Sequence, residues 1–404
     1  MSVLFQEKTL PNGNTIKNRF FKSAMSETLA SKTGVPTPIL INLYKKWAQG
    51  GAGILVTGNV MVDSNHIGEP GNVVLESASH LEKFKAWARA GKVNDTEIWM
   101  QLNHPGKQSP KSLTKQPVSP SGVAMKGSIA KGFNQSRALH EVEIKAIVQQ
   151  FVTSAVLAKE AGFTGVQIHA AHGYLVNQFL SPIENQRRDK YGGSIQNRMR
   201  VLVEIYEGIR TQLGEEFNIG LKLNSEDFKV GGFSKEDFVD VAKKLNELKI
   251  DLIEISGGNY EDPKMAGSDK ETVPYFISYA SLLKKEVNTP IVVTGGFRSI
   301  VSMEDAITQN NTDFIGMARP FVVSPNIVNH IYKNTFSDIK LPRLTTGIKA
   351  MDKTLGPVLA NSYYNQQMKR IGNNKSVVIK ENAWYPLLSS LSKHGKVAVT
   401  RLSE

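Results

Sequence analysis

Short apolar runs alternate with amphipathic stretches along most of the chain, and this repeat most strongly constrains its fold. The expected strands are 20–25, 52–57, 97–102, 165–169, 219–223, 252–256, 291–294 and 314–317. Helical patterns lie between them, and in residues 141–161 the apolar positions recur every three or four residues. Eight strand–helix units predict an α/β fold with a parallel sheet closed into a (β/α)8 TIM barrel. A doubly wound open sheet is disfavoured, because no Gly-x-Gly-x-x-Gly turn follows the first strand.

Three segments do not belong to this repeat. Residues 3–18 resemble a β-hairpin turning at Asn12-Gly13, which in a barrel would plug the amino-terminal end. Residues 103–140 and 257–274 are insertions after the third and sixth strands, too long for ordinary connectors. Both insertions leave carboxyl ends of strands, so we expect them to overhang one mouth as active-site loops.

The last part of the chain is expected to extend the barrel. We predict the barrel in residues 1–335 and an extension in 336–404 that packs on it without forming an independent domain. Within the extension the pattern predicts a helix near 358–371, a strand at 377–380 (VVIK) and another short helix.

Composition excludes several kinds of chemistry. The chain has Cys 0, which excludes disulfides, thiolate metal sites, iron–sulfur clusters and catalytic thiols. A net charge of +12 could attract nucleic acid, an anionic membrane or a phosphorylated cofactor. Because the lysines are scattered, we favour a solvated basic surface, with steering of an anionic nucleotide as the second interpretation. No apolar run of membrane-spanning length and no signal-peptide pattern is present, so a cytoplasmic enzyme is expected.

Polar residues are concentrated where the fourth strand ends. His169, His172 and Tyr174 lie within six positions. The two histidines could hold a metal, form satisfied hydrogen bonds in the barrel mouth, or act as a donor pair toward a carbonyl oxygen. A metal is disfavoured, because neither a His-Glu-x-x-His pattern nor a thiol supplies further ligands. Tyr174 could be a packing residue or a proton donor.

Two glycine-containing turns follow the last two strands. Gly295-Gly296-Phe297-Arg298 comes after the seventh strand and Gly316-Met317-Ala318-Arg319-Pro320 closes the eighth. Glycine allows close backbone approach, and backbone N–H groups with an arginine bind phosphate. Ordinary turns remain the alternative, but the pair favours a phosphate site.

Three consecutive motifs are similar to one family. The runs His-Ala-Ala-His-Gly-Tyr-Leu (169–175), Asn-Gln-Phe-Leu-Ser-Pro (177–182) and Asp-Lys-Tyr-Gly-Gly-Ser (189–194) resemble the Old Yellow Enzyme family of FMN-dependent NAD(P)H oxidoreductases. The resemblance implies that NADH or NADPH reduces FMN, and that hydride from flavin N5 then reduces the C=C bond of an α,β-unsaturated carbonyl compound. It further implies that His169 and His172 bind the substrate oxygen and that Tyr174 is the proton donor.

The same resemblance implies a set of flavin contacts. It assigns the cofactor to Ala24, Met25, Ser26, Asn59, Gln101, His169, Lys222, Gly296, Phe297, Ala318 and Arg319. Three of these depart from the family pattern: Ser26 stands for Thr or Cys, Lys222 for Arg, and Ala318 for Gly. A serine keeps the hydroxyl, a lysine keeps the charge without the planar fork, and an alanine keeps the backbone donor with less clearance.

Three rival functions are weaker. One family branch carries an iron–sulfur cluster, which needs cysteine ligands. A tRNA-dihydrouridine synthase would suit the basic charge, but such enzymes rely on a cysteine as proton donor. Both are disfavoured because this chain contains no cysteine. A non-catalytic flavin- or phosphate-binding barrel is disfavoured by the intact His169, His172 and Tyr174. We therefore expect a small-molecule enone or related electrophile as partner, no nucleic acid or membrane, no bound metal, and a homo-oligomer as one option.

Overall fold

The computed structural model describes residues 2–259, 261 and 274–394. Parallel strands of this part close into a barrel, because the fourth strand pairs with the third and the eighth pairs with the first. In chain order the eight barrel strands are β3 (Phe20–Lys22), β4 (Ile54–Val56), β7 (Glu97–Asn103), β10 (Gly165–Ala170), β11 (Asn218–Asn224), β12 (Leu252–Ser256), β13 (Ile291–Thr294) and β14 (Phe314–Met317). Each lies at an expected apolar run, so the (β/α)8 TIM barrel is confirmed.

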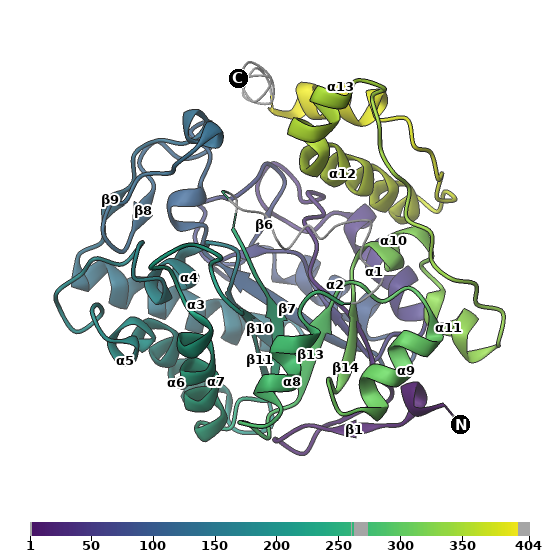
Figure 1. Ribbon diagram of the computed structural model, residues 1–404, viewed down its shortest axis with the longest axis horizontal. Helices are drawn as coiled ribbons and strands as arrows, with labels where there is room; N and C mark the ends of the chain where they lie inside the picture. Colours follow the sequence, from purple (N-terminus) through teal and green to yellow (C-terminus); the bar gives the residue numbers. More distant parts are fainter. Residues whose placement is uncertain (1, 260, 262–273, 395–404) are drawn as a thin grey trace.

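Helices follow the strands and surround the barrel (Figure 1). Those of the barrel region are α1 (Pro38–Gln49), α2 (Leu81–Gly91), α3 (Glu141–Glu160), α4 (Leu175–Leu180), α5 (Ile195–Arg198), α6 (Arg200–Leu213), α7 (Lys235–Glu247), α8 (Ile277–Leu283), α9 (Ile300–Thr308), α10 (Arg319–Val323) and α11 (Ile327–Tyr332). Their starts follow local chemistry: Thr37 caps α1 with Pro38 in the first turn, and Ser234 and Asp237 form a capping box on α7.

The amino-terminal hairpin closes the lower end of the barrel. Strands β1 (Lys8–Thr9) and β2 (Thr15–Ile16) pair antiparallel, and a 3-10 helix at Val3–Phe5 precedes them. Leu10 and Ile16 join a buried cluster inside the barrel with side chains of β3, β4, β7, β12, β13 and β14. The expected plug is therefore confirmed.

The insertion at 103–140 contains little regular structure. It holds 3-10 helices at Gly106–Gln108 and Ser128–Gly132, and the short strands β8 (Val118–Ser119) and β9 (Arg137–Ala138), which pair parallel. Two further short strands, β5 (Val60–Met61) and β6 (Val73–Val74), extend the sheet beside β7. Most of the other insertion, 257–274, lies outside the described residues.

The carboxyl-terminal extension consists mainly of α12 (Lys349–Gly372) and α13 (Trp384–His394), in yellow-green and yellow in Figure 1. Helix α12 packs on α1, and Asn42 Nδ2 donates to the carbonyl of Gly372 at 2.8 Å. The predicted strand at 377–380 is wrong. Its Val378 N–H donates to the Gln367 side chain at 2.9 Å and its carbonyl accepts from the Tyr363 hydroxyl at 3.0 Å, so α12 side chains replace a partner strand.

Among the helices of residues 2–259, 261 and 274–394, none combines the length and the apolar character that a membrane span requires.

Candidate active site

Polar side chains occupy the upper half of the barrel interior, although the strands that carry them are otherwise apolar. Strand pairing places Gln101 beside Gln167, and Lys222 beside both His169 and Glu254. All five are buried, with exposed fractions of 4% or less. Since buried polar groups cost free energy unless they are paired, this end of the barrel is organised for binding rather than for stability.

His169, His172 and Tyr174 of the motif at residues 169–175, called the central motif below, converge at the end of β10. The ring centroid of His169 lies 4.9 Å from that of His172 and 4.8 Å from that of Tyr174. The Nδ1 atom of His169 accepts from the Ala171 N–H at 3.3 Å. In the neutral ring Nε2 therefore carries the proton, and His169 is a hydrogen-bond donor at that atom.

The backbone of His172 is in the left-handed region, with φ 62°. This conformation is uncommon for a residue other than glycine and is held here by two contacts. The Asn224 side chain accepts from the His172 N–H at 3.1 Å, and Gln108 Nε2 donates to the His172 carbonyl at 2.9 Å. The ring Nε2 lies 2.6 Å from the Ser256 hydroxyl, so a proton donated by Ser256 would make Nδ1 the donor of His172.

Both imidazoles are held neutral. Burial lowers the pKa of His169 well below its usual value, and the nearby His172 and Lys222 act in the same direction. Burial and Lys222 likewise lower the pKa of His172. A neutral donor polarises a carbonyl oxygen without transferring its proton prematurely.

Tyr174 is 4% exposed and has a polar neighbour at its hydroxyl. Asn59 Nδ2 donates to the Tyr174 hydroxyl oxygen at 3.2 Å. A donated hydrogen bond stabilises the negative charge that remains when a phenol gives up its proton, so Asn59 makes Tyr174 a better acid. The resemblance assigns Asn59 to the flavin, which stays a prediction; the contact with the tyrosine was not predicted.

Gln101 presents an acceptor that has no protein partner. Its Nε2 donates to Gln167 Oε1 at 2.7 Å, whereas its Oε1 is buried and makes no hydrogen bond with the described residues. An unsatisfied buried carbonyl oxygen is costly unless a ligand donates to it. The imide N–H of a flavin pyrimidine ring is such a donor, so Gln101 fits FMN.

Lys222 is a buried cation inside the mouth of the barrel. It is 4% exposed, and its Nζ lies 3.0 Å from Glu254 Oε1, which confirms that it does not point to solvent. A cation beside the pyrimidine end of a flavin would stabilise negative charge on the reduced ring.

The two glycine turns start side by side, because Thr294 of β13 pairs with Gly316 of β14. Gly295 and Gly296 have φ 91° and 84°. A β-carbon on Gly296 would lie 2.4 Å from Pro274 Cα, whereas one on Gly295 would meet nothing within 4 Å. Phe297 is buried, and Ala318 and Arg319 begin α10 at the same edge. The turns thus bring backbone N–H groups and an arginine to the same edge of the barrel, as phosphate binding requires.

The segment after β3 reaches the same edge, since the Ser23 N–H donates to the Met317 carbonyl at 2.9 Å. Ala24, Met25 and Ser26 are half-buried there. The Ser26 hydroxyl donates to Glu69 Oε2 at 2.5 Å. With its proton used in this way, the Ser26 oxygen can only accept from a further group such as a flavin N–H.

A second polar cluster lies beside this site. Ligand-type atoms of Asp63, His66 and His104 lie within 4.8 Å of one another. His66 Nδ1 is 2.6 Å from Asp63 Oδ2, and the Asn65 backbone N–H and side chain both donate to Asp63 Oδ1. Burial raises the pKa of Asp63, but these hydrogen bonds outweigh it and lower that pKa overall. Burial lowers the pKa of His104 to about 3. Hydrogen bonds already satisfy the carboxylate, whereas His104 Nε2 is buried without a partner among the described residues, and the absence of a metal stays a prediction.

Ion pairs between the buried Lys107 and half-buried partners join the loops at the rim of the mouth. Lys107 Nζ lies 2.6 Å from Glu184 and 3.5 Å from Glu261, which also pairs with Lys229. These residues follow β7, β10, β11 and β12, so the network links four loops. It holds Lys107, in the insertion at 103–140, in a fixed place.

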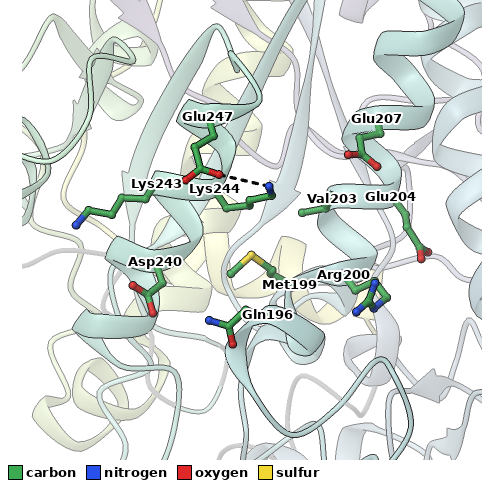
Figure 2. A pocket seen from close by; sticks show the side chains of 10 residues that line it. All are labelled: Gln196, Met199, Arg200, Val203, Glu204, Glu207, Asp240, Lys243, Lys244 and Glu247. Carbon is green, nitrogen blue, oxygen red and sulfur yellow. Dashed lines mark hydrogen bonds and ion pairs between the residues drawn. The ribbon is translucent and has the colours of Figure 1, made fainter.

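A separate groove of about 600 Å³ lies on the outside of the barrel between α6 and α7 (Figure 2). Its walls carry charges of both signs, including Arg200, Glu204, Asp240 and Lys243. No residue of the central motif lines it, so it is distinct from the mouth.

Sequence reasoning missed several residues of the site. Gln167, Glu254 and Thr294 hydrogen-bond inside the barrel, while Ser256 and Asn224 contact His172. Gln167 and Glu254 interrupt apolar strands, GVQIHA and LIEIS. Gln101 interrupts its strand, EIWMQLN, in the same way, so this signal could have identified Gln167 and Glu254.

A parallel barrel with these donors, this amide acceptor and these glycine turns has the architecture of a flavin-dependent oxidoreductase. Residues 3–337 match the model of the NADH:flavin oxidoreductase / NADH oxidase family, and the chain belongs to that family. The cofactor of the family is FMN and its reductant NADH or NADPH, which confirms the prediction from sequence.

Relatives support the assignment. The chain is 33% identical to the NADH-dependent flavin oxidoreductase iliE of Hypocrea jecorina, over 83% of this chain and 92% of that protein. It is 35% identical to nadA of Aspergillus parasiticus, over 88% of this chain and 82% of that protein. A relative from Neonectria is 38% identical over 78% of this chain, which spans only 45% of that protein.

Solved structures share the fold. The Old Yellow Enzyme homologue from Zymomonas mobilis superimposes with a TM-score of 0.71 at 25% identity, covering 82% of this chain and 93% of that one. A 2-naphthoyl-CoA reductase gives 0.78 at 26% identity, covering 82% of this chain and 52% of that one.

Proposed function

We propose that the protein is an NAD(P)H-dependent ene-reductase that reduces the C=C bond of α,β-unsaturated carbonyl compounds. The observation that carries this proposal is the convergence of two neutral imidazoles and a tyrosine whose hydroxyl oxygen accepts from an amide. Bound FMN would supply the hydride for the β-carbon. The donors of His169 and His172 would hold the substrate oxygen and stabilise the negative charge that develops on it. Tyr174 would give its proton to the α-carbon, with Asn59 stabilising the phenolate.

Gln101, Lys222, Ser26 and the segment of Ala24 and Met25 would line the flavin ring. The backbone of Gly296, Phe297 and Ala318 and the side chain of Arg319 would hold its phosphate. The support is the buried acceptor of Gln101 and the two glycine-containing turns at adjacent strand ends.

A spectrum of the purified protein tests the function. We expect a flavin band that bleaches anaerobically with NADH or NADPH and returns on addition of cyclohexenone. A band that returns only with oxygen would contradict the ene-reductase assignment while leaving FMN in place. Absence of flavin after reconstitution with FMN would contradict the cofactor site as well.

The low pKa of the imidazoles predicts pH-independent binding of a neutral carbonyl ligand. An exposed histidine with a pKa of about 6.5 gains most of its charge between about pH 8 and pH 6. Burial lowers the pKa of His169 and His172, so both stay neutral across this window. The Kd of cyclohexanone, which has no titratable group, should stay constant when measured by flavin absorbance on the oxidised enzyme. A break centred near about pH 6.5 would show that one imidazole titrates normally.

Gly296→Ala should weaken FMN binding by more than about tenfold, or 1.4 kcal/mol. The new β-carbon would lie 2.4 Å from Pro274 Cα, so the backbone N–H groups of the turn must move. Gly214→Ala is the matched control, because Gly214 also has positive φ, 77°, but its β-carbon would meet nothing within 4 Å. The flavin-to-protein ratio after dialysis measures the effect. Equal retention in the two variants would place the phosphate elsewhere.

A further inference from the structure

Glu254 lies at the centre of the hydrogen bonds inside the barrel. It is fully buried, and each carboxylate oxygen is used. Oε2 accepts from Gln167 Nε2 at 2.8 Å. Oε1 accepts from the Thr294 hydroxyl at 2.7 Å and lies 3.0 Å from Lys222 Nζ. The Lys222 ammonium, the Thr294 hydroxyl and the Gln167 NH2 group are all donors in these contacts, so the Glu254 carboxylate acts only as an acceptor.

That restriction fixes the direction of the neighbouring amides. Gln167 must turn its NH2 group toward Glu254, so its Oε1 faces Gln101. Gln101 must then turn its own NH2 group toward Gln167, which it does at 2.7 Å. Its Oε1 is consequently left facing away, buried and without a partner among the described residues. An amide side chain can present either its NH2 group or its carbonyl oxygen to a ligand. Here the Glu254 carboxylate, acting through Gln167, makes Gln101 present its carbonyl oxygen.

A second series of hydrogen bonds leaves the other side of the carboxylate through Thr294. The proton of Thr294 is used toward Glu254, so the Ser23 hydroxyl must donate in the contact of 2.8 Å between Ser23 and Thr294. Ser23 directly precedes Ala24, Met25 and Ser26. The Glu254 carboxylate thereby sets the direction of hydrogen bonds that reach both Gln101 and the segment of Ala24, Met25 and Ser26.

We propose that Glu254 is a positioning residue that, through Gln167, makes Gln101 present a carbonyl oxygen to the imide N–H of the bound flavin. This inference rests on the proposed contact between Gln101 and FMN. Removal of Glu254 would leave the two amides without a preferred direction. The Gln101 NH2 group would then face the flavin N–H in part of the molecules, which weakens FMN binding.

A double-mutant cycle on FMN affinity tests the proposal. We expect Glu254→Gln and Gln101→Leu each to raise the Kd of apoprotein for oxidised FMN about tenfold, since each loses one buried hydrogen bond. The double variant should bind about as tightly as Gln101→Leu alone, because residues that act through one another are non-additive. Multiplied effects, about a hundredfold, would overturn the proposal. If the unmodified apoprotein failed to bind FMN, the proposed FMN site itself would be wrong, and this result can be told apart from failure of the role of Glu254.

A second variant removes the link without disturbing the ion pair. Gln167→Leu leaves Lys222 and Glu254 together and should also be non-additive with Gln101→Leu. Because a carbonyl oxygen near the ring opposes added negative charge and an NH2 group favours it, Gln167→Leu should make the FMN reduction potential more positive. A tenfold change in the ratio of the affinities for oxidised and reduced FMN corresponds to about 29.6 mV in the two-electron potential. If Gln167→Leu folded normally and its FMN reduction potential were unchanged, the proposal would be contradicted.

Glu97→Gln is the matched control. Glu97 also lies on a barrel strand, and its carboxylate accepts from Asn218 Nδ2 at 3.2 Å, but at the opposite end of the barrel. This variant should leave both the FMN Kd and the potential as in the unmodified protein. A shift equal to that of Glu254→Gln would show a general effect of removing a barrel carboxylate and would overturn the specific role.

Discussion

Tyr174→Phe should slow the reoxidation of reduced enzyme by cyclohexenone by about 10²–10⁴-fold, the range typical of a lost general acid. The variant keeps the ring that contacts His169 but removes the hydroxyl that accepts from Asn59. Reduction of FMN by NADH or NADPH needs no proton from Tyr174, so that half-reaction should be nearly unchanged. Stopped-flow absorbance separates the two half-reactions.

Tyr332→Phe is the control for this experiment, because Tyr332 is 63% exposed on α11. It should leave both half-reactions unaltered. If Tyr174→Phe slowed both half-reactions equally, the tyrosine would have a structural role and the proton donor would have to be sought elsewhere.

His172→Ala should lower the rate of enone reduction by about 10²–10³-fold, as expected for loss of one donor to a developing oxyanion. It should also weaken the binding of phenols to the oxidised enzyme, because a phenol oxygen imitates the enolate. The left-handed backbone of residue 172 is held by Asn224 and Gln108 through main-chain atoms, so the turn can persist without the ring.

Titration of the flavin absorbance with p-cresol measures the second effect. His330→Ala, which removes an exposed imidazole on α11, provides the comparison. A p-cresol titration curve that does not change in His172→Ala would contradict the donor pair.

The barrel strands could be predicted because a buried parallel strand has a simple signature, an apolar run bounded by polar residues. The segment 377–380 has the same signature and is not a strand. Its backbone partners are Gln367 and Tyr363, which no local pattern can reveal.

The site was predictable in part for a similar reason. His169, His172 and Tyr174 are close in sequence, and the structure brings them together. The role of Glu254 depends on Gln167, which is 87 residues away, and thus on the register of three strands. Asn59 was identified, but its contact with the Tyr174 hydroxyl required the fold. Residues 260 and 262–273, which belong to an insertion predicted to shape the substrate site, lie outside the described part of the chain.

The hairpin beneath the barrel has a kinetic consequence. Leu10 and Ile16 close the floor together with side chains of the barrel strands, so within the described residues the proposed site is approached from the opposite end, where the strands finish. Nicotinamide and enone would then occupy the same place in turn. Double-reciprocal plots of turnover should form parallel lines, and an excess of either reactant should obstruct the other.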